Sequence, residues 1–292
     1  MKIIDILKEE KVTLSFEVFP PKKEANFDSV KKATEEIAAL HPAFMSVTYG
    51  AGGGTSDYTL AIARNIEKNY GVPALAHLTC VSSTRGTVRE QITAMHAAGI
   101  ENVMALRGDL QPGMETQDRR SWDYRYASEL VQELRSSGVP FCIGGACYPE
   151  IHPESSSRKE DIRHLHKKVD AGCDFLNTQM FFDNKILYNF LDDLRAEGIY
   201  LPVVAGIMPI TTRKQAERSV QISGSYMPQN LQDLVERFGD DSAAMQQAGI
   251  AYAVAQIIDL IANGVNHIHV YTMNKPEVAR QIQACLQDLL GR

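Results

Sequence analysis

The sequence has 292 residues, 44% hydrophobic and 23% charged, and its 30 Lys and Arg against 36 Asp and Glu give a net charge of −6. This composition argues against a disordered chain, and the acidic balance argues against a nucleic-acid partner. The sequence contains no run of about 18 apolar residues, so we predict no membrane span. The charged start MKIIDILKEEK is unlike a secretory signal. We therefore expect a cytoplasmic protein of either two domains or one large α/β barrel.

Short apolar segments alternate with longer amphipathic ones along the chain. Two polar stretches, 111–124 and 223–242, are interpreted as a long loop and as an added segment before the last helix of the alternation. The apolar segments predict strands at 13–19, 44–48, 74–79, 102–107, 141–147, 174–178, 202–206 and 266–271. The amphipathic segments predict helices at 27–40, 56–70, 84–98, 125–137, 157–171, 183–196, 211–221 and 243–263, with an extra C-terminal helix at 275–290.

The connections between these segments indicate how the strands are paired. A glycine follows several of the predicted helices, as Gly71 and Gly99 do, and a strand begins soon afterwards. Such short connections favour parallel strands. We therefore predict an α/β fold in which residues 1–292 form a single (β/α)₈ TIM barrel with an extra C-terminal helix. A doubly wound sheet is the alternative, but its G-x-G-x-x-G turn is incomplete in the nearest segment, 50–55.

Glu17 is the first candidate for chemistry, because active sites of such barrels lie at the carboxyl ends of the strands. Alternation along the first strand sends Leu14, Phe16 and Val18 towards the helices and Glu17 into the mouth of the barrel. A buried carboxylate is costly unless it is paired or used, and burial favours its protonated form, which suits a general acid. An ion pair with a Lys or Arg is the alternative.

Further polar residues follow other predicted strands. Arg107-Gly108-Asp109 ends the fourth strand, and it forms either a ligand contact or a solvated salt bridge. The segment 148–153 (YPEIHP) ends the fifth strand, and Gln179 follows the sixth, where its amide suits an amide-like or pteridine-like ring. These residue types predict a site for a polar small molecule.

The histidines of the last strand and the basic residues of one helix can each be interpreted in two ways. His267 and His269 share one face of the last strand, and with His77 they could bind the metal of a metal-dependent hydrolase. Such an enzyme needs further metal ligands, which the other strands do not supply. We therefore favour packing roles for these histidines and expect no metal. The predicted helix 157–171 carries a basic face that is either solvated or offsets phosphate charge, together with Arg107 at the same rim. That face consists of Arg163, His164, Lys167 and Lys168.

Seven segments at these strand ends together resemble the methylenetetrahydrofolate reductase family. The resemblance runs from about residue 12 to the C-terminus, and it is to the bacterial catalytic-barrel form, because eukaryotic members carry an additional regulatory domain. Each segment is short, and their consistent order makes the match specific. The segments are Ser15–Pro21, Ser46–Ala51, His77–Cys80, Ala105–Asp109, Tyr148–Pro153, Lys168–Gly172 and Thr178–Asp183.

The resemblance implies an FAD-containing oxidoreductase of one-carbon metabolism and methionine biosynthesis. NADH or NADPH would reduce the flavin, which would then reduce 5,10-methylenetetrahydrofolate to 5-methyltetrahydrofolate. Glu17 would be the general acid, and Asp109 would be a second catalytic residue beside the flavin and the folate, where it tunes the flavin and contacts the pterin. Gln179 would bind substrate, with Gln215 and Lys275 near the folate or the nicotinamide. FAD would contact Thr48, His77, Leu106, Arg107, Gly108, Asp109, Tyr126, Ala127, Tyr148, His152, Asp161, His164, Lys167 and Lys168.

Three positions depart from the bacterial family pattern. His164 and Lys167 replace an Asn and an Arg, and Ser219 replaces a Phe that packs against nicotinamide and folate. The Ser219 difference leaves open whether NADH, NADPH or an electron-transfer partner protein supplies the electrons, and the physiological direction is open too. The family suggests a homo-oligomer. A folate- or flavin-binding module without catalysis is a further alternative, but binding alone does not need a buried acid.

Overall fold

Eight parallel strands close into a barrel in the computed structural model, which describes residues 1–21, 24–49, 56–81, 83–110 and 121–291. Each strand pairs with the next, and β8 closes the barrel on β1 with Thr13 opposite His267. The predicted (β/α)₈ barrel is therefore confirmed, and the doubly wound sheet is excluded. The strands are β1 Thr13–Val18, β2 Met45–Val47, β3 Ala74–Thr79, β4 Asn102–Leu106, β5 Cys142–Cys147, β6 Phe175–Thr178, β7 Val203–Ile207 and β8 His267–Tyr271.

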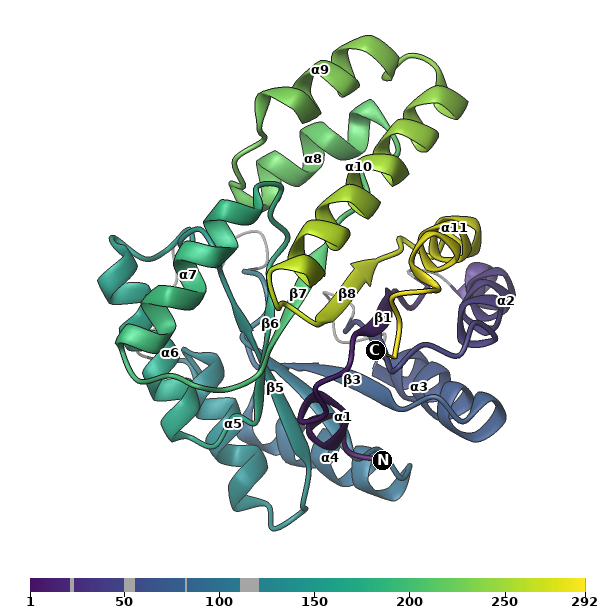
Figure 1. Cartoon of the computed structure of the whole chain (residues 1–292). Helices are drawn as coiled ribbons and strands as arrows, with labels where there is room; N and C mark the ends of the chain where they lie inside the picture. Colours follow the sequence, from purple (N-terminus) through teal and green to yellow (C-terminus); the bar gives the residue numbers. More distant parts are fainter. Residues whose placement is uncertain (22–23, 50–55, 82, 111–120, 292) are drawn as a thin grey trace.

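Helices surround the barrel (Figure 1). Two of them were not predicted: α1 has only five residues, too few to show a periodic pattern, and α9 lies inside the polar stretch 223–242. Segment 50–55 and residues 111–120 of the predicted long loop lie outside the described residues. The helices are α1 Ile3–Leu7, α2 Phe27–Ala38, α3 Ser56–Tyr70, α4 Arg85–Ala97, α5 Ala127–Ser136, α6 Arg158–Asp170, α7 Asn184–Ala196, α8 Arg213–Ser223, α9 Gln229–Phe238, α10 Ser242–Ala262 and α11 Pro276–Leu286, with a 3₁₀ turn at Glu24–Asn26.

Local sequence signals explain where many of these helices begin and end. Ser157 and Thr212 accept hydrogen bonds from backbone N–H groups in the first turns of α6 and α8, which satisfies donors that have no partner within the helix. Gly71 and Gly99 follow α3 and α4 with positive φ angles of 67° and 83°. The left-handed conformation predicted at these helix ends is therefore present.

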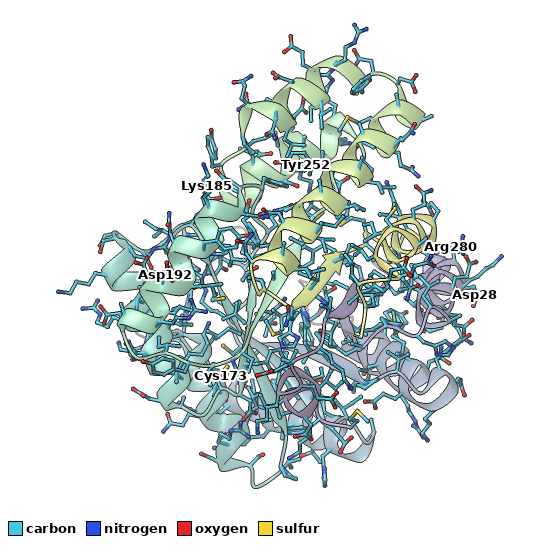
Figure 2. The ribbon with its side chains drawn as sticks, in the orientation of Figure 1. Asp28, Cys173, Lys185, Asp192, Tyr252 and Arg280 are labelled. Atoms are coloured by element: carbon cyan, nitrogen blue, oxygen red, sulfur yellow. The ribbon has the colours of Figure 1, made fainter. Side chains whose placement is uncertain are left out.

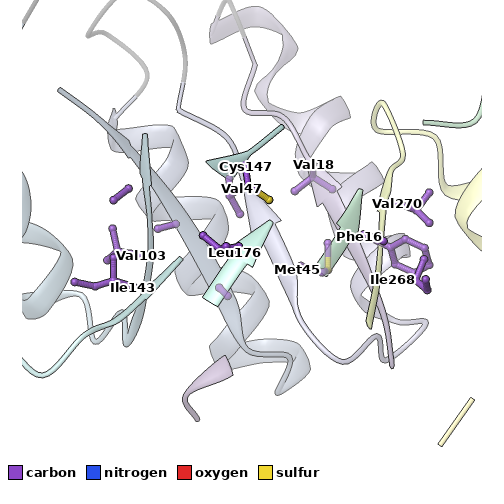
Figure 3. Close-up of a cluster of buried hydrophobic side chains, with 14 of the residues drawn as sticks. Phe16, Val18, Met45, Val47, Val103, Ile143, Cys147, Leu176, Ile268 and Val270 are labelled. Carbon is purple, nitrogen blue, oxygen red and sulfur yellow. The ribbon is translucent and has the colours of Figure 1, made fainter. Parts of the chain in front are cut away.

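The two faces of the barrel wall bury different sets of side chains. The outward face carries residues such as Phe16, Val18 and Val270, which join the main hydrophobic core under the helices (Figure 3). The inward face at the amino ends of the strands is also apolar. There Leu75, Met104, Cys142, Phe175 and Val204 pack with Phe44 and with Ile3 and Leu7 of α1. Helix α1 thus covers the amino end of the barrel, and the carboxyl end is left for a site.

Helices α8, α9 and α10 extend away from the ring of helices (Figure 1). They enclose a third apolar cluster that includes Leu231 and Met245. Tyr252 of α10, labelled in Figure 2, ties this part to the barrel. Its hydroxyl donates to the carbonyl of Phe182 at 2.7 Å. On the other side, Arg280 of α11 pairs with Glu36 of α2 at 3.9 Å. Within the described residues, no helix is long and apolar enough to cross a membrane.

Candidate active site

A cavity of about 1030 Å³ opens at the carboxyl ends of the strands. Its volume is at the top of the range for small-molecule pockets, about 300–1,000 Å³. All the predicted site residues line it except Lys167, Gln215 and Lys275. The predicted residues that line it are Glu17, Thr48, His77, Leu106, Arg107, Gly108, Asp109, Tyr126, Ala127, Tyr148, His152, Asp161, His164, Lys168 and Gln179.

Glu17 lies at the floor of this cavity, and alternation along β1 places it there as predicted. Its residue is 7% exposed. Its Oε2 atom lies within hydrogen-bond distance of Ser46 Oγ, at 3.1 Å, and it lies 3.6 Å from Nε2 of His77 and 3.9 Å from Nε2 of His269. Among the described residues, the basic groups within 4.0 Å of this carboxyl group are both histidines. The alternative of a Lys or Arg partner therefore finds no support.

Two neighbours of Glu17 are held neutral by burial. Burial lowers the pKa of His77 to about 4, against a smaller opposing effect of Glu17. Burial likewise raises the pKa of Tyr271 well above its ordinary value. Among the described groups, His77 Nε2 and Asn177 Oδ1 are buried without a hydrogen-bond partner, although most buried polar atoms have one. These atoms mark a place where a ligand has polar partners to meet.

The wall formed by β4, β5 and α6 carries the basic groups. Lys168 reaches from α6 to donate to the carbonyl of Ala146, and burial lowers the pKa of its ammonium group. A Cβ at Gly145 would lie 2.5 Å from the Lys168 Cδ, so this glycine gives the lysine its path. Arg107 forms a bidentate ion pair with Glu154, with N–O distances of 2.7 and 2.9 Å. A partly buried ammonium beside a second cation suits an anionic ligand.

The outer rim of the cavity is aromatic as well as basic. Tyr126 stacks on His164 with a centroid distance of 4.9 Å, and Nζ of Lys167 lies 5.9 Å from the same tyrosine ring. Arg163 is exposed, pairs with Glu160 at 3.2 Å and does not line the cavity. The rim is therefore less basic than the sequence predicts, because one of the four expected cations is turned to its own helix.

Gln215 and Lys275 meet outside the cavity. The Gln215 Oε1 atom accepts hydrogen bonds from the backbone N and the hydroxyl of Thr211, each at 3.0 Å, and Lys275 donates to the same hydroxyl at 2.9 Å. Met208 links this group to the site, because it lines the cavity and its sulfur lies 3.1 Å from Nε2 of Gln215. Ser219 is buried on α8 and is not a lining residue.

The two histidines of β8 point to different partners. The ring of His267 contacts Thr13 and the carbonyl of Leu7, whereas His269 lies between Ser15 and Ser46. No group of three or more His, Cys, Asp or Glu in the described parts of the chain is placed to hold a metal. The hydrolase alternative therefore finds no ligand set among the residues that the structure describes.

Several polar residues at the floor were not singled out from the sequence. Ser46, Asn177 and Tyr271 are all buried, and Asn177 and Tyr271 line the cavity. Their signal was weak, because a single polar residue in an apolar strand segment does not reveal what faces it across the barrel. Once Phe175 is known to face inward, alternation along the strand predicts that Asn177 faces inward too.

The fold and the cavity define a (β/α)₈ barrel with a small-molecule site at the carboxyl ends of its strands, the usual location in this architecture. The chain belongs to the methylenetetrahydrofolate reductase family, whose model matches residues 2–287.

Named relatives support this assignment. The chain is 35% identical over 288 residues to methylenetetrahydrofolate reductase 1 of Schizosaccharomyces pombe, covering 97% of this chain and 48% of the relative. It is 34% identical to methylenetetrahydrofolate reductase (NADH) 1 of Arabidopsis thaliana, covering 94% of this chain and 49% of the relative. It is 33% identical to 5,10-methylenetetrahydrofolate reductase of Escherichia coli, covering 93% and 89%. The chain thus spans about half the length of the fungal and plant relatives.

Solved structures with little sequence identity share the fold. An uncharacterized protein from Clostridium thermocellum, described as binding two copies of 5-methyl-5,6,7,8-tetrahydrofolic acid, matches 99% of this chain and 98% of its own with a TM-score of 0.62 at 16% identity. A 2,3-dimethylmalate lyase matches 98% of this chain and 85% of its own with a TM-score of 0.52 at 10% identity. At these identities the likeness concerns the barrel alone.

Proposed function

We propose that this chain is a catalytic barrel that reduces 5,10-methylenetetrahydrofolate to 5-methyltetrahydrofolate, with electrons from NADH or NADPH carried by FAD. Family membership supports the folate reaction, and the observation that carries the mechanism is Glu17. This carboxyl group is buried at the floor of a cavity large enough for two ring systems, and no Lys or Arg among the described residues pairs with it.

Glu17 acts as the general acid in this proposal. Its proton passes to the nitrogen that leaves when one C–N bond of the methylene bridge breaks, which gives the iminium form of the folate. The neutral His77 and Tyr271 nearby supply no fixed positive charge that would favour the carboxylate. A positioned acid of this kind contributes about 10²–10⁴-fold to a rate.

The residues of the cavity fit FAD. His77 Nε2 is buried without a partner and faces the cavity, and Lys168 and Arg107 stand on one wall where a diphosphate needs positive charge. Gly108 has a φ of 88° and packs against Thr79 and Val81, so the turn that carries Arg107 and Asp109 needs glycine. Bound FAD would supply a carrier for two electrons between the nicotinamide and the folate.

The remaining residues would orient the ligands. Asp109 is exposed at the mouth of the cavity, next to the proposed flavin contacts of Arg107 and Gly108. Gln179 lines the cavity with its amide oriented by the backbone N–H of Met180 at 2.9 Å. Tyr148 and His152, which meet edge to face at 4.6 Å, would flank the flavin. Gln215 and Lys275 would contact the folate or the nicotinamide from the neighbouring group around Thr211, and Lys167 would contact FAD from the rim.

We further propose that the whole chain works as one catalytic unit, in the cytoplasm and as a homo-oligomer. The electron donor is either a nicotinamide dinucleotide or a partner protein, since Ser219 lacks the ring expected against nicotinamide. Relatives named for NADH make NADH the first donor to test.

Anaerobic titration of the FAD-loaded protein tests cofactor, donor and direction together. We expect NADH or NADPH to bleach the flavin absorbance, methylenetetrahydrofolate to restore it, and methyltetrahydrofolate to bleach it in the reverse direction. Failure to bind FAD would overturn the proposal. A flavin reduced only by a partner protein would keep the folate reaction and change the donor.

A further inference from the structure

A chain of buried hydrogen bonds runs from Glu17 of β1 through Ser46 of β2 and His269 of β8 to Ser15 of β1. Ser46 Oγ lies 3.1 Å from Glu17 Oε2 and 2.9 Å from His269 Nε2, and Ser15 Oγ lies 2.8 Å from His269 Nδ1. Ser15 also donates to the carbonyl of Ile268 at 2.9 Å. Ser15, Ser46 and His269 are each 0% exposed, so water does not replace any of these partners.

The Ser15 end of this series of hydrogen bonds fixes the position of each proton. A backbone carbonyl only accepts, so the single hydroxyl proton of Ser15 goes to Ile268, and Ser15 Oγ accepts from His269. The ring proton of His269 is therefore on Nδ1. In a neutral imidazole, Nε2 is then an acceptor, and it accepts the single hydroxyl proton of Ser46. Ser46 Oγ is left as an acceptor towards Glu17, so with a neutral His269 ring every bond is satisfied only when Glu17 carries a proton.

The competing arrangement has an imidazolium at His269 and a carboxylate at Glu17. It would place two charges 3.9 Å apart in the buried interior of the barrel, and charges buried in this way lose their hydration. Phe44 stacks on the His269 ring at 5.4 Å, and Tyr271 meets it edge to face at 5.7 Å. His77 and Tyr271 are the other titratable groups near Glu17. Burial keeps both neutral at pH 7, since it lowers the pKa of His77 to about 4 and raises the pKa of Tyr271 well above its ordinary value.

We propose that His269 is a positioning residue that holds Glu17 in its protonated form through Ser46. His269 Nε2 takes the Ser46 proton that would otherwise stabilise the carboxylate, and Ser46 is thereby left as an acceptor for the Glu17 proton. This role rests on the proposed function, since it describes the acid of the folate half-reaction.

Substitution of His269 provides a kinetic test in the FAD-loaded protein. His269→Phe removes the acceptor, so Ser46 donates to the carboxylate, and the pH at which the folate half-reaction loses half its rate should fall by about one unit. His269→Gln restores an acceptor at the Nε2 position and should bring the profile back. His267→Phe is the matched control on the same strand, because its partners are Thr13 and Leu7, and it should leave the profile unchanged.

Reduction of the flavin by the nicotinamide donor should be unchanged in all three variants. A profile of His269→Phe that does not move would overturn the proposal in favour of a packing role. A profile that moves to higher pH would also overturn it, because it would show that an imidazolium had been stabilising the carboxylate.

A spectroscopic test needs neither turnover nor a folded His269→Phe protein. In ¹⁵N-histidine-labelled holoprotein at pH 7, the ring signals lost in His269→Gln identify His269, and we expect a neutral ring with its proton on Nδ1. An imidazolium, or a proton on Nε2, would overturn the proposal. Absence of methylenetetrahydrofolate reduction in the unsubstituted protein would instead refute the proposed function, and the ring state would still be read.

Discussion

The two ends of the barrel are lined by the same strands but hold opposite kinds of side chain. On β3 the inward residue is Leu75 at the amino end and His77 at the carboxyl end, and on β6 the pair is Phe175 and Asn177. The amino end is closed by α1 and packed with apolar side chains. The carboxyl end has buried polar atoms without partners. Phe44 marks the boundary, because it packs in the apolar end and stacks on His269.

This difference shows how one barrel separates stability from chemistry. Apolar burial at the amino end contributes about 25 cal/mol per Å², whereas an unpartnered buried polar group costs free energy. The carboxyl end therefore carries groups that lower stability, and the amino end offsets them. Substitutions at the two ends should accordingly separate activity from stability.

The largest effect is expected from Glu17→Gln at the polar end. Folate reduction should fall by about 10²–10⁴-fold because the acid is lost, while flavin reduction by NADH or NADPH should change little. Stopped-flow measurement of the two half-reactions checks this, with Glu9→Gln, an exposed glutamate paired with Lys11, as the control. Equal loss of both half-reactions would contradict the role of general acid.

The apolar end should respond in the opposite way to Phe175→Ala. Removal of this fully buried ring should lower the free energy of unfolding by about 3–5 kcal/mol, and both half-reactions of the protein that remains folded should keep their rates. Urea denaturation measures the change. Tyr200→Ala, at a side chain that is 79% exposed, is the matched control and should cost less than about 0.5 kcal/mol.

His77 predicts how stability depends on pH. Its pKa is lowered to about 4 by burial, so below about pH 6.5 the unfolded chain binds a proton that the folded chain does not. Stability should therefore fall as the pH drops from about 6.5 to 4, by up to about 3 kcal/mol from this group.

His77→Gln should flatten that loss in urea denaturation between pH 4 and 8, because glutamine does not ionise. The exposed His96→Gln is the control and should keep the full loss. A His77→Gln protein with the same acid loss as the unsubstituted one would show that His77 is not its source.

The smallest effect is expected at Asn102, the buried polar residue of the apolar end. Its Oδ1 accepts from the backbone N of Ile3 at 2.7 Å, and its Nδ2 donates to Ala74 at 3.3 Å. Asn102→Ala leaves a buried N–H unpaired and should cost about 1–3 kcal/mol, with faster hydrogen exchange in α1. Unchanged exchange at Ile3 would show that this bond does not hold α1.

How far the sequence predicted the site depended on the range of the signal. The inward direction of Glu17 was predicted because alternation is local to one strand. Lys168 was predicted at the rim through the family resemblance, because its helix by itself reads as a basic face, and the space over Gly145 shows that its ammonium turns to Ala146. Gln215 and Lys275 were predicted near the ligands, and the structure joins them at Thr211 outside the cavity.

The sequence by itself determined the order of strands and helices and which side of each strand is apolar, since both follow from patterns within a few residues. It did not determine which inward side chains meet. Ser15, Ser46 and His269 come from three strands, and they join only because β8 closes on β1 with Ser15 opposite His269. Closure and register depend on the packing of the whole barrel. Only the tertiary structure therefore decided that His269 lies next to Ser46 and Glu17.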